Sequence, residues 1–113
     1  MFAFITNIRA KPGMRDGLAA LTHAMMVQTS TEEGVPVYVF HQSEDDLDDF
    51  WFYDLYESEQ AYSDHCSSDA FQVMISQISE FGEIKLMHKL IPYGSVKSAG
   101  VATATSNPNA SRR

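Results

Sequence analysis

His65 and Asp54 are the two side chains in this sequence that could act together in acid–base chemistry. His65 falls in the second turn of a helix expected to start near Glu59, and an imidazole titrates close to neutral pH, as a proton-accepting base should. The alternative is that His65 only ties its helix to the rest of the fold through one hydrogen bond. The residue types leave both interpretations open.

Asp54 lies inside the aromatic strand predicted for residues 50–56, where an ionised carboxylate is costly unless it is paired. Its partner could be His65, Asn7 or Arg9. If the partner is His65, the carboxylate would fix the imidazole tautomer and raise its basicity. A purely structural tether between strand and helix is an equally good interpretation.

The aromatic strand is apolar on both of its faces. One face carries Phe50, Phe52 and Tyr56, and the other carries Trp51, Tyr53 and Leu55. Neither face would be stable in water, and a chain of 113 residues has helices to cover only one of them. A second copy of the chain is therefore expected on the other face, and residue parity alone does not decide which face that is.

The order of predicted elements is strand, helix, strand, strand, helix, strand. Strands are predicted at 2–9, 37–42, 50–56 and 84–91, and helices at 14–31, at 59–65 after a Ser58 cap, and from a Ser67 or Ser68 cap to Phe81, with Gly82 ending the last. This order predicts an α+β, ferredoxin-like βαββαβ fold, with an antiparallel sheet and helices on one face. Residues 1–93 form this domain, and residues 94–113, rich in Ser, Ala, Thr and Asn, are expected to be a disordered tail.

Composition excludes several partners and sites. The net charge is −7, but three of the eight basic residues and none of the fifteen acids lie beyond Tyr93. The domain up to Tyr93 therefore carries a charge of −10, which disfavours a nucleic acid as a binding partner. The acids of residues 43–49 lack the pattern of a calcium loop and predict a solvated hairpin tip. A single cysteine, Cys66, excludes an intrachain disulfide, and no segment has the length of a membrane span or the form of a signal peptide. A cytoplasmic protein without membrane partners is expected.

These features together resemble the antibiotic biosynthesis monooxygenase family of the dimeric α/β-barrel superfamily. The residues that carry the resemblance are Lys11-Pro12-Gly13, Glu33-Gly34 followed by Tyr38, Ser43 to Asp46, Tyr53-Asp54-x-Tyr56, and Ser58-x-x-Ala61-x-x-x-His65-x-x-Ser68-x-x-Phe71. The resemblance covers residues 2 to about 93. It departs from the family at Asp54, where a glutamate is usual, and in the tail beyond Tyr93.

The resemblance implies a homodimer whose two sheets face each other, with one pocket per subunit between sheet and helices. It also implies a cofactor-independent monooxygenase that oxidises a small aromatic, phenolic or quinol substrate with O₂, and neither an organic cofactor nor a metal. In this interpretation His65 is the base, Asp54 orients it, and Asn7 donates a hydrogen bond to the developing oxyanion. The predicted substrate-binding residues are Trp51, Phe52, Tyr56, Tyr62 and Phe71, although an indole such as Trp51 more often belongs to the core or the dimer interface.

Two other functions are compatible with the same fold. Haem degradation fits Asn7, but His65 stands where that subfamily would have a pocket Trp, and Ile75 stands where the haem-ligating His would lie. The other alternative is a dimer that binds a small molecule or serves a stress response without catalysis.

Overall fold

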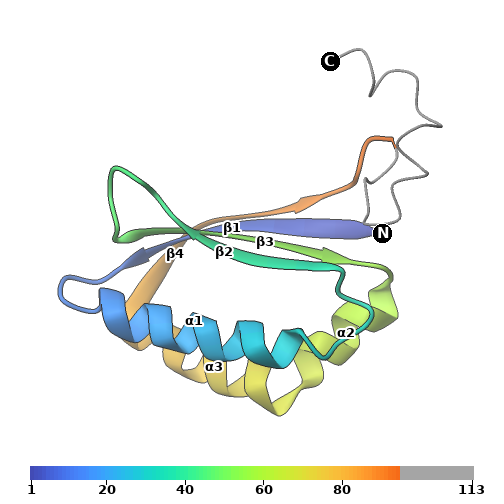
Figure 1. Cartoon of the computed structure of the whole chain (residues 1–113), viewed down its shortest axis with the longest axis horizontal. Helices are drawn as coiled ribbons and strands as arrows, with labels where there is room; N and C mark the ends of the chain where they lie inside the picture. The colour runs from blue at the N-terminus through green and yellow to red at the C-terminus, as the bar shows by residue number, and fades with distance from the viewer. Residues whose placement is uncertain (95–113) are drawn as a thin grey trace.

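One antiparallel sheet and one layer of helices make up residues 1–94, which are the residues that the computed structural model describes (Figure 1). The strands are β1 (Phe2–Ala10), β2 (Val37–Gln42), β3 (Asp49–Tyr56) and β4 (Gly82–Leu90), and the helices are α1 (Arg15–Thr29), α2 (Glu59–Ser67) and α3 (Asp69–Phe81). The strand order is β2-β3-β1-β4, with every neighbouring pair antiparallel. This confirms the ferredoxin-like α+β fold, whereas the second subunit stays a prediction. The predicted tail lies, except for Gly94, outside the described residues.

Both predicted serine caps are present at the starts of α2 and α3. The Ser58 hydroxyl accepts a hydrogen bond of 3.1 Å from the Ala61 N–H, and the Ser68 hydroxyl accepts one of 3.1 Å from the Phe71 N–H. Ser68 has extended backbone angles, so α2 ends there and α3 leaves in a new direction. The break leaves His65 in the last turn of α2, beside the start of α3.

Gly82 ends α3 as predicted, but it is also the first residue of β4, which begins two residues earlier than expected. Its φ of −157° is ordinary extended backbone. A Cβ at this position would lie 2.9 Å from Ile8 Cγ2 and 3.0 Å from the Arg9 carbonyl oxygen. Glycine is therefore required here by close packing and not by a turn.

The apolar residues that recur at helical spacing in the helical segments are only partly buried. Met14 is 40% exposed and Ile75 is 46% exposed. Buried positions of α1 are taken instead by Thr22 and Thr29, whose hydroxyls donate to carbonyl oxygens one turn earlier in the same helix. Hydropathy missed these threonines because a hydroxyl satisfied within its own helix can be buried at little cost.

Two apolar clusters hold the helices against the sheet, one toward each end of β1. The larger contains Ile8, Ala10, Leu18, Phe50, Phe52 and Ile78, and the smaller contains Phe2, Val35 and Tyr56. Phe4 and Thr6 lie on the same face of β1 between the two clusters. A cavity occupies this intermediate position.

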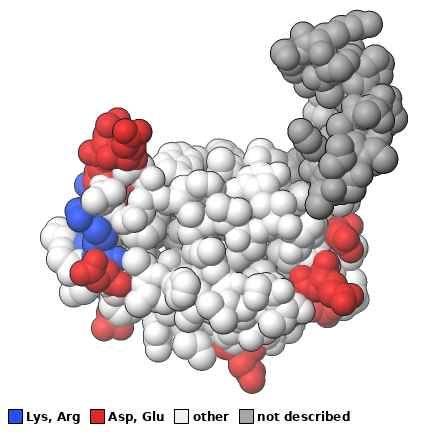
Figure 2. Space-filling model, in the orientation of Figure 1, with Lys and Arg blue, Asp and Glu red and all other residues white. Residues whose placement is uncertain are grey.

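Charged side chains gather away from the core. Figure 2 shows acidic groups at the tip of the β2–β3 hairpin with basic groups beside them, and a second acidic group at the opposite end of the visible face. Arg9 pairs with Asp46 at 2.7 Å, and Arg15 pairs with Asp48 at 2.8 Å. These exposed pairs at the hairpin tip agree with the expected solvated loop. Within residues 1–94, no helix has the length and apolar character needed to cross a bilayer.

Candidate active site

The candidate site is a cavity of about 100 Å³ between the sheet and the helices. Aromatic and aliphatic side chains form most of its wall, and the polar groups in the wall are Thr6, Asp54, His65 and the hydroxyls of three tyrosines, Tyr38, Tyr56 and Tyr62. Six of the eight residues predicted for the site line it: His65, Asp54, Phe52, Tyr56, Tyr62 and Phe71. The cavity is therefore the place where the predicted chemistry can be examined.

His65 is fixed within this wall from several sides. It is 1% exposed, and its ring centroid lies 5.1 Å from that of Tyr38, 5.4 Å from that of Tyr56 and 5.4 Å from that of Phe71. Its Nδ1 forms a hydrogen bond of 2.7 Å with Glu32 Oε1, while Nε2 has no hydrogen-bond partner among residues 1–94. An ionised carboxylate can only accept, so Nδ1 is the donor of this bond, and in the neutral imidazole Nε2 then carries the lone pair.

Glu32 is a site residue that the sequence analysis missed. It lies in the loop between α1 and β2, and the loop approaches α2 closely because Gly34 has no side chain: a Cβ on Gly34 would lie 2.6 Å from Ala61 Cβ. The Glu57 N–H donates to the Gly34 carbonyl at 3.0 Å and fixes the loop. The only available signal was the Glu32-Glu33-Gly34 sequence at the helix end, which looks like an ordinary solvated loop.

The structure does not form the predicted hydrogen bond between Asp54 and His65. Asp54 instead accepts a hydrogen bond of 2.5 Å from the Tyr56 hydroxyl, two residues along the same face of β3. The other two proposed partners are also engaged elsewhere, since Asn7 binds Asp49 and Arg9 binds Asp46. Asp54 and His65 thus share the cavity wall, but Glu32 holds the ring.

Asn7 and Trp51 are not in the cavity. They face each other across β1 and β3 on the side of the sheet that no helix covers, because side chains alternate along a strand. Asn7 Nδ2 donates to Asp49 Oδ1 at 2.6 Å and to the Phe50 carbonyl at 2.9 Å, and Trp51 Nε1 donates to Asp49 Oδ2 at 3.0 Å. The placement of Asn7 and Trp51 against a substrate in this cavity was therefore wrong.

Burial keeps the tyrosines of the cavity protonated. Desolvation raises the pKa of Tyr62 to about 12, and it raises the pKa values of Tyr38 and Tyr56 further, with the nearby charge of Asp54 adding to the effect. Burial also raises the pKa of Asp54, against the opposing hydrogen bond from Tyr56. The phenols stay protonated at neutral pH and therefore cannot act as bases, so the groups of the wall that can accept a proton are His65 and Asp54.

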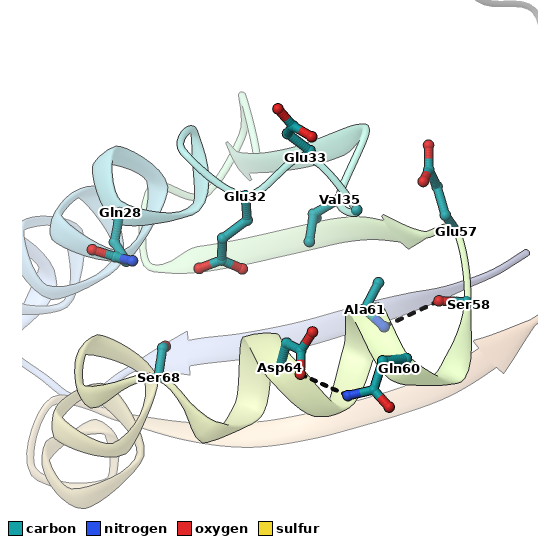
Figure 3. A pocket seen from close by; sticks show the side chains of 11 residues that line it. Gln28, Glu32, Glu33, Val35, Glu57, Ser58, Gln60, Ala61, Asp64 and Ser68 are labelled. Atoms are coloured by element: carbon teal, nitrogen blue, oxygen red, sulfur yellow. Dashed lines mark hydrogen bonds between the residues drawn. The ribbon is translucent and has the colours of Figure 1, made fainter.

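A second, more polar cavity of about 490 Å³ lies on the other side of Glu32 (Figure 3). In Figure 3 the Glu32 carboxylate points into the space between its own loop and α2, whereas Glu33 points away from α2. Glu57 and Asp64 also line this groove, and no Lys or Arg does. Glu32 consequently separates a polar groove from the aromatic cavity, and its Oε2 is buried without a hydrogen-bond partner among the described residues.

The residues of the aromatic cavity do not fit a haem. Its volume is below the roughly 300 Å³ at which pockets for drug-sized ligands begin. Ile75, which stands at the position of the expected haem ligand, lines the cavity and cannot ligate iron. No group of three or more potential metal-binding side chains occurs within residues 1–94.

The sequence and the fold of this chain are both similar to those of known proteins. The family model described as antibiotic biosynthesis monooxygenase matches residues 1–77. A Chloroflexus aurantiacus J-10-fl protein that carries the family name is 25% identical, with 84% of this chain and 95% of that chain covered and a TM-score of 0.72. Rv0793 of Mycobacterium tuberculosis is 25% identical, with 83% and 96% covered and a TM-score of 0.76. No curated protein matches the sequence.

A protein of Deinococcus radiodurans that also carries the family name shares the fold alone, at 14% identity, with 88% of this chain and 100% of that chain covered and a TM-score of 0.75. The family match itself extends over two thirds of the sequence, from β1 into α3, and includes every side chain that holds His65. This chain belongs to the antibiotic biosynthesis monooxygenase family.

Proposed function

We propose that this protein is a cofactor-independent monooxygenase that oxidises a small phenol or quinol with O₂. One observation carries the proposal: a fully buried histidine lines an aromatic cavity, with one ring nitrogen held by a carboxylate and the other without a hydrogen-bond partner among the described residues. This is the arrangement of an oriented general base in a site from which water is excluded. Membership of a monooxygenase family supports the same reaction class.

The reaction needs little from the protein beyond proton transfer and orientation. His65 Nε2 accepts the phenol proton, and the resulting electron-rich anion transfers an electron to O₂. The two radicals combine to form the new carbon–oxygen bond, and cleavage of the oxygen–oxygen bond releases water. A phenol and O₂ thus give a quinone and water, and the four electrons lost by the ring all reduce O₂, so that no other reductant is required.

The remaining side chains of the cavity orient the substrate. Glu32 holds the His65 ring and its tautomer, a role that the sequence analysis had given to Asp54. Asp54 instead offers an acceptor to a second hydroxyl of the substrate, beside the Tyr56 hydroxyl that it already binds. Phe52, Tyr62 and Phe71 supply aromatic surface for the ring.

The protein also acts as a homodimer in this proposal, with the helix-free faces of two sheets in contact. Val39 and Leu90 on this face are 38% and 39% exposed, and Tyr53 is only partly buried. A half-exposed apolar sheet face is the kind of surface that obligate dimers cover.

Oxygen uptake in the presence of phenols and hydroquinones tests the function. We expect the wild-type protein to consume O₂ with at least one of them, and His65→Gln to reduce the rate by about 10² or more, since Gln approximates the ring volume without supplying a base. The matched control is His23→Gln, an exposed histidine of α1 that does not line the cavity, which should leave the rate unchanged. Near-wild-type turnover by His65→Gln would make His65 structural. Binding without any oxygen uptake by the wild type would favour the non-catalytic alternative.

A further inference from the structure

The aromatic cavity opens where α3 and β4 leave apolar side chains uncovered. Ile75, Ile84 and Met87 line the cavity and are 46%, 49% and 52% exposed, in contrast to His65 at the closed end. The rest of β4 also lacks cover, since Gly82 is its only buried residue. The three side chains therefore form an apolar rim around the opening, and we refer to them as the mouth.

An irregularity in the sheet builds this mouth. Ile84 pairs with Ile8 and Met87 pairs with Thr6, so both face the helices although their positions differ in parity. The shift of register between Asn7 and Ile8 leaves one extra residue in β4, and such a β-bulge reverses the alternation of side chains. Without it, Ile84 and Met87 would lie on opposite faces of the sheet.

The interior sets the size and the charge of what can enter. A cavity of about 100 Å³ holds no more than one aromatic ring, since an engineered apolar cavity of about 150 Å³ in another protein binds benzene. None of the residues that line the cavity is Lys or Arg, and Glu32 already offsets any positive charge on His65. A carboxylate or phosphate on the ring would therefore meet no counter-charge, whether it lies inside the cavity near Asp54 or against the half-exposed apolar mouth.

We propose that the ligand of this cavity is an uncharged single-ring phenol or hydroquinone with an apolar substituent that lies across the mouth. The phenolic hydroxyl, which meets His65, is taken from the proposed function, on which this inference rests. The inference adds that the ligand has one ring, no charge and an apolar substituent. The ring fills the cavity. The substituent covers Ile75, Ile84 and Met87, which otherwise expose apolar surface to water.

Calorimetric titration under argon tests this proposal without turnover. The ligands are 4-methylphenol, 4-propylphenol and 4-pentylphenol, with 4-hydroxybenzoate and 1-naphthol as the charged and the two-ring comparisons. Full burial of a methylene tightens binding about fourfold, so about twofold per methylene is expected at a half-open mouth and about 16-fold from methyl to pentyl. Both comparison ligands should bind at least about tenfold more weakly than 4-methylphenol.

The double variant Ile84→Thr/Met87→Gln should remove most of the gain from methyl to pentyl while the affinity for 4-methylphenol stays within about twofold. The matched control is Val73→Thr, which changes an α3 side chain that is 51% exposed but does not line the cavity, and it should keep the full gain. An equal gain in the double variant would overturn the proposal. So would tighter binding of 4-hydroxybenzoate or 1-naphthol than of 4-methylphenol, or no binding of any alkylphenol.

These results separate the ligand class from the function. Alkylphenol binding with the expected pattern but without oxygen uptake would leave this inference standing and remove the proposed function. Oxygen uptake with only charged or two-ring substrates would leave the proposed function standing and overturn this inference.

Discussion

Polar side chains have different surroundings on the two faces of the sheet. On the helix-covered face, His65 and Asp54 are enclosed by aromatic rings, and each has one specific partner, Glu32 or Tyr56. On the helix-free face, Asn7 joins Asp49 and Trp51 in a partly exposed network that tethers β1 to β3. A polar residue in a strand therefore indicates a site only once its face is known, because the alternation of side chains along the strand decides whether that residue faces a cavity.

Placing the same charge on adjacent residues of β3 is the strongest test of this contrast. Phe52→Lys should prevent folding, because Phe52 is 7% exposed, its ring centroid lies 4.2 Å from that of Phe40, and a lysine there would be buried without a partner. Tyr53→Lys should fold but dissociate the proposed dimer, with a rise of about 100-fold or more in its dissociation constant. Circular dichroism and sedimentation measure the two effects. A folded Phe52→Lys or a dimeric Tyr53→Lys would contradict the assignment of the faces.

Glu32→Gln tests the helix-covered face alone. The amide keeps an acceptor for His65 Nδ1 but removes the charge that fixes the tautomer, so kcat should fall by about 10–100-fold with little change in KM. Glu33→Gln is the matched control, because its carboxylate points away from α2 in Figure 3, and it should retain full activity. A loss in KM instead of kcat would indicate that Glu32 shapes the cavity without acting through His65.

Asn7→Ala tests the helix-free face, and its expected effect is smaller. Loss of the two hydrogen bonds to Asp49 and Phe50 should lower the free energy of unfolding by about 1 kcal/mol. Turnover per folded subunit should not change, because Asn7 lies across the sheet from His65. Chemical denaturation and oxygen uptake on the same samples would check both expectations, and a large fall in kcat would restore Asn7 as a catalytic residue.

The fold was predictable because local signals and the global pattern agree. Alternating apolar residues, two serine caps and Gly82 mark almost every boundary to within two residues. The exposure of Met14 and Ile75 and the burial of two threonines of α1 could not be predicted, since hydropathy does not report which part of a helix the sheet covers. The bulge in β4 has no sequence signal, because Lys85 is an ordinary strand residue.

The site was predictable in part. Four residues of the family motif lie around one cavity because β3 leads directly into α2: Asp54, Tyr56, His65 and Phe71. The motif residues Ser58, Ala61 and Ser68 line the polar groove instead. The partner of His65 could not be predicted, since Glu32 comes from a loop 33 positions earlier that reaches α2 only through the close contact at Gly34. Nor could parity alone say that Phe52 and not Trp51 faces the helices, because both sets of side chains on β3 are apolar.

Asp54 provides the smallest and most specific test, through the dependence of stability on pH. Burial raises its pKa in the folded protein above the ordinary value of 3.8, so the folded state holds this proton more tightly than the unfolded chain does. The contribution of Asp54 to stability is therefore greatest below pH 3.8 and is lost as the pH rises through the elevated folded value. Asp54→Asn mimics the protonated acid and keeps an acceptor for the Tyr56 hydroxyl.

The melting temperature of Asp54→Asn should accordingly exceed that of the wild type by a few degrees at pH 7, with the difference shrinking toward pH 4. Asp45→Asn, at the exposed hairpin tip, should show no such trend and serves as the control. Destabilisation by Asp54→Asn at pH 7 would mean that the ionised carboxylate is stabilised by its surroundings. The group in the cavity wall that can stabilise an ionised Asp54 is a protonated His65. That result would make Asp54 the electrostatic partner of His65, with Glu32 and Asp54 on either side of one imidazolium.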